Sequence, residues 1–180
     1  MDETEIVKGC AKGSENARRH LYERFSDQLY RIALRYVRDQ NEAEDITLIS
    51  FTKIFDRISK FENRHEGSLV AWMRKIVVNE ALMVLRKRHN FNLVETIDHN
   101  LDVPDLSALQ DVEADYIYAL LLDLPLGYRT VFNLYVIEGY DHQEIGEMLG
   151  VSANTSRTQL FKAKSVLKKK IEKGNSLYGT

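Results

Sequence analysis

The sequence has little of what several protein classes depend on. Its single cysteine, Cys10, leaves no internal disulfide framework and no thiolate metal cluster. Two prolines and nine glycines in 180 residues allow few tight turns, which favours long helices. No apolar run approaches the roughly 18 residues that a membrane-spanning helix needs, so we expect no membrane insertion. The first five residues are acidic and lack an apolar core, so we expect no signal peptide and a cytoplasmic protein.

The formal net charge of −2 conceals three blocks of different sign. Residues 1–91 and residues 128–180 each carry +3, whereas residues 92–127 carry −8 and contain no lysine or arginine. Clustered cations are the electrostatic footprint of a polyanion partner, so the charge pattern leaves room for a nucleic acid. A lysine-rich, solvated helix end explains the last block equally well, because cations suit the negative end of the helix dipole.

Apolar side chains recur at spacings of three and four through much of the chain, which is typical of amphipathic helices. The pattern predicts three helices in the first half, the third capped by Ser68. A second helical unit starts near Val112, and Pro125 suits the first position of a helix over 126–138. The predicted helices of the first half are 15–38, about 41–60 and about 68–88, with a loop at 61–67 and an acidic linker at 92–111.

The stretch from 141 to 164 has the layout of a helix-turn-helix. Asp141 caps a short helix over 142–149, and Gly150 follows where a left-handed helix end favours glycine. Ser152 caps a second helix that begins one residue later. Gly146 removes side-chain bulk where we expect the two helices to cross. A helical hairpin with a basic surface is the alternative interpretation.

The second helix of this motif carries the residues expected to read DNA. Arginine binds a guanine edge or a phosphate, threonine a phosphate or a methyl group, phenylalanine a thymine methyl and lysine a phosphate. The candidate set for this contact is Ser152, Thr155, Arg157, Thr158, Phe161 and Lys162.

Short motifs follow one another in a fixed order along the chain. In the first half they are 41–46 (NEAEDI), Phe51, Phe55 and 68–79 (SLVAWMRKIVVN), and in the second half Leu124, Pro125, Arg129, 144–146 (EIG), 149–152 (LGVS) and Thr155. Each is weak alone, but in this order they resemble the extracytoplasmic-function (ECF) group of bacterial sigma-70-type sigma factors over almost the entire chain. The resemblance implies an all-α fold of two small helical domains joined by a flexible acidic linker, the C-terminal one a helix-turn-helix.

The resemblance also implies a dissociable subunit of RNA polymerase with divided tasks. Residues 1–91 correspond to sigma region 2, which binds core RNA polymerase and recognises and melts the minus-ten element. Residues 112–180 correspond to sigma region 4, which recognises the minus-thirty-five element. The segment 39–60 corresponds to the part that docks on the clamp of the largest core subunit. Promoter DNA and an anti-sigma factor are the other expected partners.

Two further candidate sets combine the resemblance with chemistry. Opening a DNA duplex requires aromatic surface for unstacked bases and cations for phosphates. Some of these candidates also have a purely structural interpretation. Trp72 could belong to the core, the cations at 86–88 could be a solvated helix end, and Asp45 could simply suit the start of a helix. The minus-ten candidates are Phe61, Asn63, Arg64, Trp72, Arg74, Lys75, Asn79, Arg86 and Lys87, and the core-polymerase candidates are Glu44, Asp45 and Phe51.

The chain departs from the family pattern in three places. Leu48 and Ile49 stand where the family usually has a glutamine and an acid. Met83 stands where an acid is common, which predicts altered minus-ten selectivity. Gln159 replaces a usual arginine or lysine, which predicts the loss of one phosphate contact.

Two other classes of function compete with this interpretation. A helix-turn-helix transcription regulator that acts without core polymerase would need a sensor in the first half, and the strand-and-helix alternation of a receiver domain is missing there. An enzyme would need a reactive constellation, but the five histidines show no paired ligand spacing and no glycine-rich phosphate loop occurs. We therefore expect no catalytic residue, no metal and no cofactor.

Overall fold

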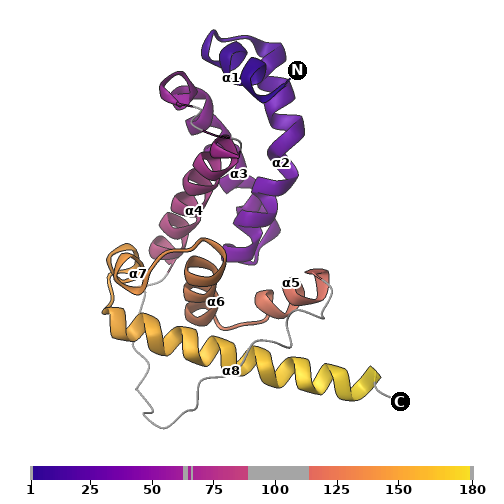
Figure 1. The fold of residues 1–180 in the computed structure, drawn as a ribbon, viewed down its shortest axis with the longest axis vertical. Helices are drawn as coiled ribbons and strands as arrows, with labels where there is room; N and C mark the ends of the chain where they lie inside the picture. Colours follow the sequence, from indigo (N-terminus) through magenta and orange to yellow (C-terminus); the bar gives the residue numbers. More distant parts are fainter. Residues whose placement is uncertain (1, 63–64, 66, 89–113, 179–180) are drawn as a thin grey trace. The chain divides into compact units, whose positions relative to one another are not determined.

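A computed structural model describes residues 2–62, 65, 67–88 and 114–178 (Figure 1). Every regular element within these ranges is a helix, which confirms the predicted all-α class. The chain divides into two compact units, residues 1–88 and residues 89–180. The predicted acidic linker at 92–111 lies outside the described residues.

The first unit is built on three long helices that pack on one another, α2, α3 and α4. The short helix α1 lies against α2 and against the 3-10 turn η1. The apolar side chains whose spacing of three and four residues predicted α2 are all buried, so they belong to the core of the unit. They are Leu21, Phe25, Leu29, Ile32 and Tyr36. The elements are α1 (Glu3–Ala11), α2 (Glu15–Val37), α3 (Gln40–Arg57), η1 (Ile58–Lys60) and α4 (Ser68–Arg88).

Helix starts in this unit follow local capping chemistry. The Asp39 carboxylate accepts a hydrogen bond from the Glu42 amide at 2.9 Å, which fixes the start of α3. Helix α4 has the predicted bounds of about 68–88, although Ser68 is its first residue and not the capping residue before it. Lys53 of α3 and Glu80 of α4 form an ion pair at 2.5 Å that ties the two helices together.

Helix α1 was not predicted, although its start carries a recognisable signal. Asp2 and Glu5 form a reciprocal capping box, in which each carboxylate accepts the backbone N–H of the other residue. The helix buries Ile6 and Cys10 against its neighbours. Burial raises the pKa of the Cys10 thiol, which is what an apolar packing role requires.

The second unit is organised around one long helix, α8 (Ala153–Tyr178). Helices α6 and α7 pack along it, and α5 touches it as well. The predicted helix over 126–138 is helical as far as Ile137, but it is α-helical only to Phe132 and then continues as a π-helical turn. The other elements are α5 (Ala114–Leu122), α6 (Leu126–Phe132), the π-turn η3 (Asn133–Ile137) and α7 (His142–Leu149).

A buried arginine, Arg129, connects the first two described helices of this unit by hydrogen bonds. Pro125 is the residue before α6 rather than its first residue. The Arg129 side chain donates from Nη1 to the carbonyl oxygens of Leu122 and Leu124, at 3.3 and 2.8 Å. These carbonyls stand at the end of α5, where no helical partner is left for them. The guanidinium therefore joins the end of α5 to α6, and Lys170 adds an ion pair from α8 to Asp123.

Candidate nucleic-acid interface

In the helix-turn-helix of the second unit, the capping residues fix both ends of α7 and the start of α8. The Asp141 carboxylate accepts hydrogen bonds from the amides of Gln143 and Glu144, both at 2.8 Å. Gly150 closes α7 with a left-handed φ of 70°, and the Ser152 hydroxyl accepts from the Thr155 amide at 3.0 Å. The predicted bounds of α7 and the predicted start of α8 are therefore confirmed.

Helix α8 presents four of the six predicted DNA-reading residues on one face. Arg157 is exposed, and Thr158, Phe161 and Lys162 are half-buried beside it. At 3.6 residues per turn these four positions fall within about 140° of the helix circumference, so their side chains border one side of α8. The other two candidates, Ser152 and Thr155, bond to each other through their hydroxyls at 2.8 Å, at the start of the same helix.

One expectation for this helix is wrong. Gln159 is only 4% exposed, because a step of two residues from Arg157 leads to the opposite side of α8. A lysine or arginine at this position would point into the unit and not toward a ligand. The glutamine therefore removes no phosphate contact from the exposed face.

In the first unit, two aromatic rings lie against each other in a tilted arrangement beside a hollow. Phe61 and Trp72 have ring centroids 5.0 Å apart and an interplanar angle of 35°. The half-buried indole is not a core residue, since the neighbouring Leu69 and Met73 carry the packing. The hollow has a volume of about 480 Å³ and is lined by Lys60, Phe61, Glu62, His65, Ser68, Ala71 and Trp72. Two further candidates for this contact, Asn63 and Arg64, lie outside the described residues.

A stripe of side chains continues from the hollow along the outer face of α4. Lys75 and Asn79 are exposed one and two turns after Trp72, followed by Met83, Arg86 and Lys87. Met83 interrupts the polar stripe with an exposed thioether, where the family pattern has an acid. Arg74 does not belong to the stripe, because it lies about 200° around the helix from Trp72. It is half-buried on the side that faces the rest of the unit.

The candidates for binding core polymerase divide between the surface and the core. Glu44 and Asp45 are exposed on α3. Phe51 is 3% exposed and packs between Tyr22 and Phe55, with ring centroids 4.8 and 5.8 Å away. This burial leaves the ring little surface to offer a partner, so its contact with core polymerase stays a prediction from the sequence. It supports the exposed ring of Tyr22 from below.

An exposed apolar surface in this region was not predicted from the sequence. Leu48 and Ile49 are 55% and 46% exposed on α3, and Tyr22 is exposed on α2. A usable signal was present for Leu48, which stands two residues after the buried Ile46 and six before the buried Ile54 and so falls outside their helical spacing.

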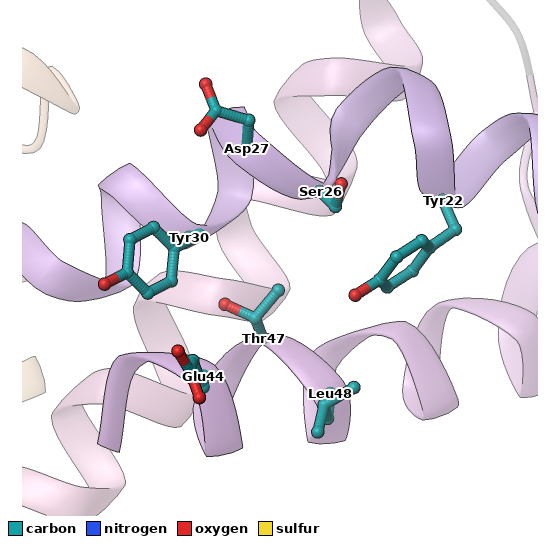
Figure 2. A pocket seen from close by; sticks show the side chains of 7 residues that line it. All are labelled: Tyr22, Ser26, Asp27, Tyr30, Glu44, Thr47 and Leu48. Atoms are coloured by element: carbon teal, nitrogen blue, oxygen red, sulfur yellow. The ribbon is translucent and has the colours of Figure 1, made fainter. Parts of the chain in front are cut away.

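A groove of about 540 Å³ runs between α2 and α3 beside these residues. Figure 2 shows Tyr22 of α2 opposite Leu48 of α3, and Tyr30 above Glu44 further along. The groove thus combines two tyrosine rings and Leu48 with the carboxylate of Glu44. Its lining residues are Tyr22, Ser26, Asp27, Tyr30, Glu44, Thr47 and Leu48.

No described helix is both long and apolar enough to cross a membrane. Within the part of the chain that the structure describes, no group of three histidine, cysteine or acidic side chains is placed to hold a metal ion.

Comparison with known proteins identifies both units. The family model described as Sigma-70 region 2 matches residues 21–91, and the one described as Sigma-70, region 4 matches residues 114–167. The fold is similar to that of CnrH in its complex with the cytosolic domain of CnrY. That likeness has a TM-score of 0.50 at 18% identity and covers 93% of this chain and 95% of the other.

Curated relatives share the same organisation. The ECF RNA polymerase sigma factor SigE of Mycolicibacterium smegmatis is 29% identical over 87% of this chain, which spans 62% of that protein's length. The sigma factor SigV of Bacillus subtilis is 26% identical, covering 80% of this chain and 84% of its own. The ECF sigma-E factor of Haemophilus influenzae is 24% identical, covering 93% and 94%. The region 2 and region 4 matches and these relatives show that the chain belongs to the ECF group of bacterial sigma-70-type sigma factors.

Proposed function

We propose that this chain binds core RNA polymerase in the cytoplasm and directs it to promoters that carry two recognition elements. The observation that carries the proposal is the pairing of two family regions on one chain, each with its own candidate DNA surface. Two modest contacts joined by a tether reinforce each other, because the first raises the effective concentration of the second. The chain is not an enzyme in this account, since it supplies binding energy and the polymerase performs the chemistry.

Region 4, at 112–180, recognises the minus-thirty-five element through α8. A recognition helix enters the major groove and places the side chains of its first turns on base edges. Arg157 is suited to a guanine edge and Phe161 to a thymine methyl group. Lys162 and Thr158 reach phosphates, which fix the register but carry no sequence information. The exposure of Arg157 beside these three side chains supports this division.

Region 2, at 1–91, recognises and opens the minus-ten element. An unstacked base needs an aromatic platform, which the Phe61–Trp72 pair offers next to the hollow. Lys75 and Asn79 then follow the strand along α4, and Arg86 and Lys87 hold its phosphates. Asn63 and Arg64 are the further candidates that the sequence gives for this contact.

The α2–α3 surface binds the clamp of the largest core subunit. Glu44 and Asp45 attract a basic partner, and Tyr22, Leu48 and Ile49 offer it apolar contact area. A helix that carries both cations and apolar side chains matches this groove.

An anti-sigma protein holds the chain inactive in the resting state. The related CnrH structure contains the cytosolic domain of a second protein, CnrY, which supports such a partner here. A protein recovered with the chain from cells, and displaced from it by core polymerase, is the expected observation. A chain that stays free in resting cells contradicts this part of the proposal.

The experiment that tests the function is reconstitution. The purified chain is mixed with sigma-free bacterial core polymerase, and both complex formation and promoter-dependent initiation are measured. Complex formation with initiation supports the sigma function. DNA binding without any association with core supports the alternative, a helix-turn-helix regulator that acts alone.

A further inference from the structure

Three elements of the second unit meet on one imidazole ring. His142, the first residue of α7, stacks on Tyr135 of η3 with ring centroids 4.4 Å apart and an interplanar angle of 18°. Its Nδ1 atom lies 2.9 Å from the hydroxyl oxygen of Ser156 in α8. Ser156 is 0% exposed and directly precedes Arg157, the candidate reader of a base. The ring therefore links η3 and α7 to the turn of α8 that carries this arginine.

The charges around the ring come from its own helix start and from α8. Asp141 stands beside it, Arg157 and Lys164 face it from α8, and Tyr135 is the titratable group on η3. Burial lowers the pKa of His142, the two cations lower it further, and Asp141 opposes them. The imidazole is therefore neutral near pH 7 in the free chain. Its bond to Ser156 survives protonation, because Nδ1 then donates and the hydroxyl oxygen accepts.

We propose that His142 is a positioning residue for the minus-thirty-five contact, that it holds the Arg157 turn of α8 through Ser156, and that it takes up a proton when this surface meets DNA. The proposal rests on the function proposed above for α8. Phosphates gathered around Arg157 offset the cationic repulsion that disfavours a charged imidazole. DNA binding therefore favours the imidazolium, although the ring itself need not touch a base.

The sign of the pH dependence follows from linkage. Because the pKa of His142 is higher in the DNA complex than in the free chain, promoter affinity rises as the pH falls through the pKa of the complex. The rise stops once the pH lies below the pKa of the free chain, where both states are protonated. One proton limits the slope to about tenfold per pH unit.

The test uses the holoenzyme and the strongest promoter duplex recovered from the reconstitution. Dissociation constants are measured at constant salt from about pH 5.5 to about pH 8, the range in which histidine titrates. His142→Phe keeps a ring for the stack and loses the nitrogen, Ser156→Ala loses the hydroxyl, and Ser165→Ala is the same substitution elsewhere on α8. Thermal unfolding checks that each variant folds.

The expected result has two parts. The wild-type affinity rises as the pH falls, and the affinity of His142→Phe is flat over the same range. Near pH 7, His142→Phe and Ser156→Ala each bind about three- to tenfold more weakly, as for the loss of one hydrogen bond, while Ser165→Ala binds like wild type. The double variant is no weaker than His142→Phe alone, because both changes remove the same bond.

Other outcomes overturn the inference. Equal pH profiles for wild type and His142→Phe remove the proton uptake, and additive losses in the double variant remove the link through Ser156. Arg157→Ala separates this inference from the function on which it rests. If Arg157→Ala weakens promoter binding but His142→Phe does not, only the positioning role of His142 fails; if neither does, the proposed contact of α8 with DNA fails.

Discussion

Gly146 and Val151 approach each other so closely that a Cβ atom on Gly146 would lie 2.7 Å from the carbonyl oxygen of Val151. The Val151 amide also donates to the Gly146 carbonyl at 3.0 Å. The glycine was expected where the two helices cross, and a Cβ atom there would meet both the backbone of the turn and, at 3.4 Å, the backbone nitrogen of Ala153, the first residue of α8. This contact fixes how tightly the chain turns from α7 into α8, and with it the direction of the candidate recognition helix.

Gly146→Val is expected to lower the free energy of unfolding of the chain by about 1–3 kcal/mol, because an overpacked site forces backbone to move. It is also expected to weaken promoter binding more than its loss of stability explains. Thermal unfolding and promoter affinity measure the two effects. Glu147→Val, at the next and exposed position of α7, is the matched control and should change stability only slightly. Equal effects of the two variants would show that the turn does not need the glycine.

Arg157→Ala is expected to reduce the affinity of the holoenzyme for promoter duplex by about 1–3 kcal/mol, the range for a bidentate base contact. The loss should concentrate at one base pair of the upstream element, since a phosphate contact would weaken all sequences alike. Lys173→Ala, further along α8, removes one charge from an exposed position and serves as the control. A uniform loss over all sequences would assign Arg157 to the backbone.

Trp72→Ala is expected to weaken binding of a single-stranded minus-ten oligonucleotide by the holoenzyme, because stacking contributes about 1–3 kcal/mol per base. Trp72→Phe should recover much of the loss, since any aromatic ring offers a face. Binding to the upstream duplex element should stay unchanged in both variants. If the alanine and phenylalanine variants behave alike, the Phe61–Trp72 pair serves packing alone.

Substitutions of Leu48 and Phe51, which lie one turn apart on α3, are expected to affect different properties: core polymerase binding for Leu48 and stability for Phe51. Leu48→Lys should leave thermal unfolding unchanged, because the leucine is mostly exposed, and weaken core polymerase binding about tenfold or more. Phe51→Ala should destabilise the first unit by about 3–5 kcal/mol, because it empties a buried site. Unfolding scans and core-binding titrations separate the two. A Leu48→Lys variant that binds core normally would remove the α2–α3 surface from the account.

Much of the fold could be predicted because its signals are local. Asp141, Gly150 and Ser152 mark helix ends through their own backbone and side-chain chemistry, so the helix-turn-helix was located from sequence. The π-turn after Phe132 has no such signal, because its extra residue depends on how the helix packs. Helix α1 was not predicted although Asp2 and Glu5 form a capping box at its start. It has only nine residues, which is too short for a clear apolar repeat.

The site could be predicted less completely, because exposure depends on which face of a helix finds a partner. Phe51 and Gln159 were expected at the surface and are buried, whereas Leu48 and Ile49 are exposed apolar residues. A family pattern gives the position of a residue and not the direction of its side chain. Asn63 and Arg64 remain predictions from sequence.

The central claim is that both candidate DNA surfaces act together in one promoter-directed polymerase. Its most direct test is initiation by sigma-free core polymerase and this chain on a genomic DNA library, with the wild type, Arg157→Ala and Trp72→Ala in parallel. The account predicts initiation sites that share two separated sequence elements, with the upstream element losing its influence in Arg157→Ala and strand opening impaired in Trp72→Ala. Initiation without shared elements, or DNA binding with no association with core, would contradict it.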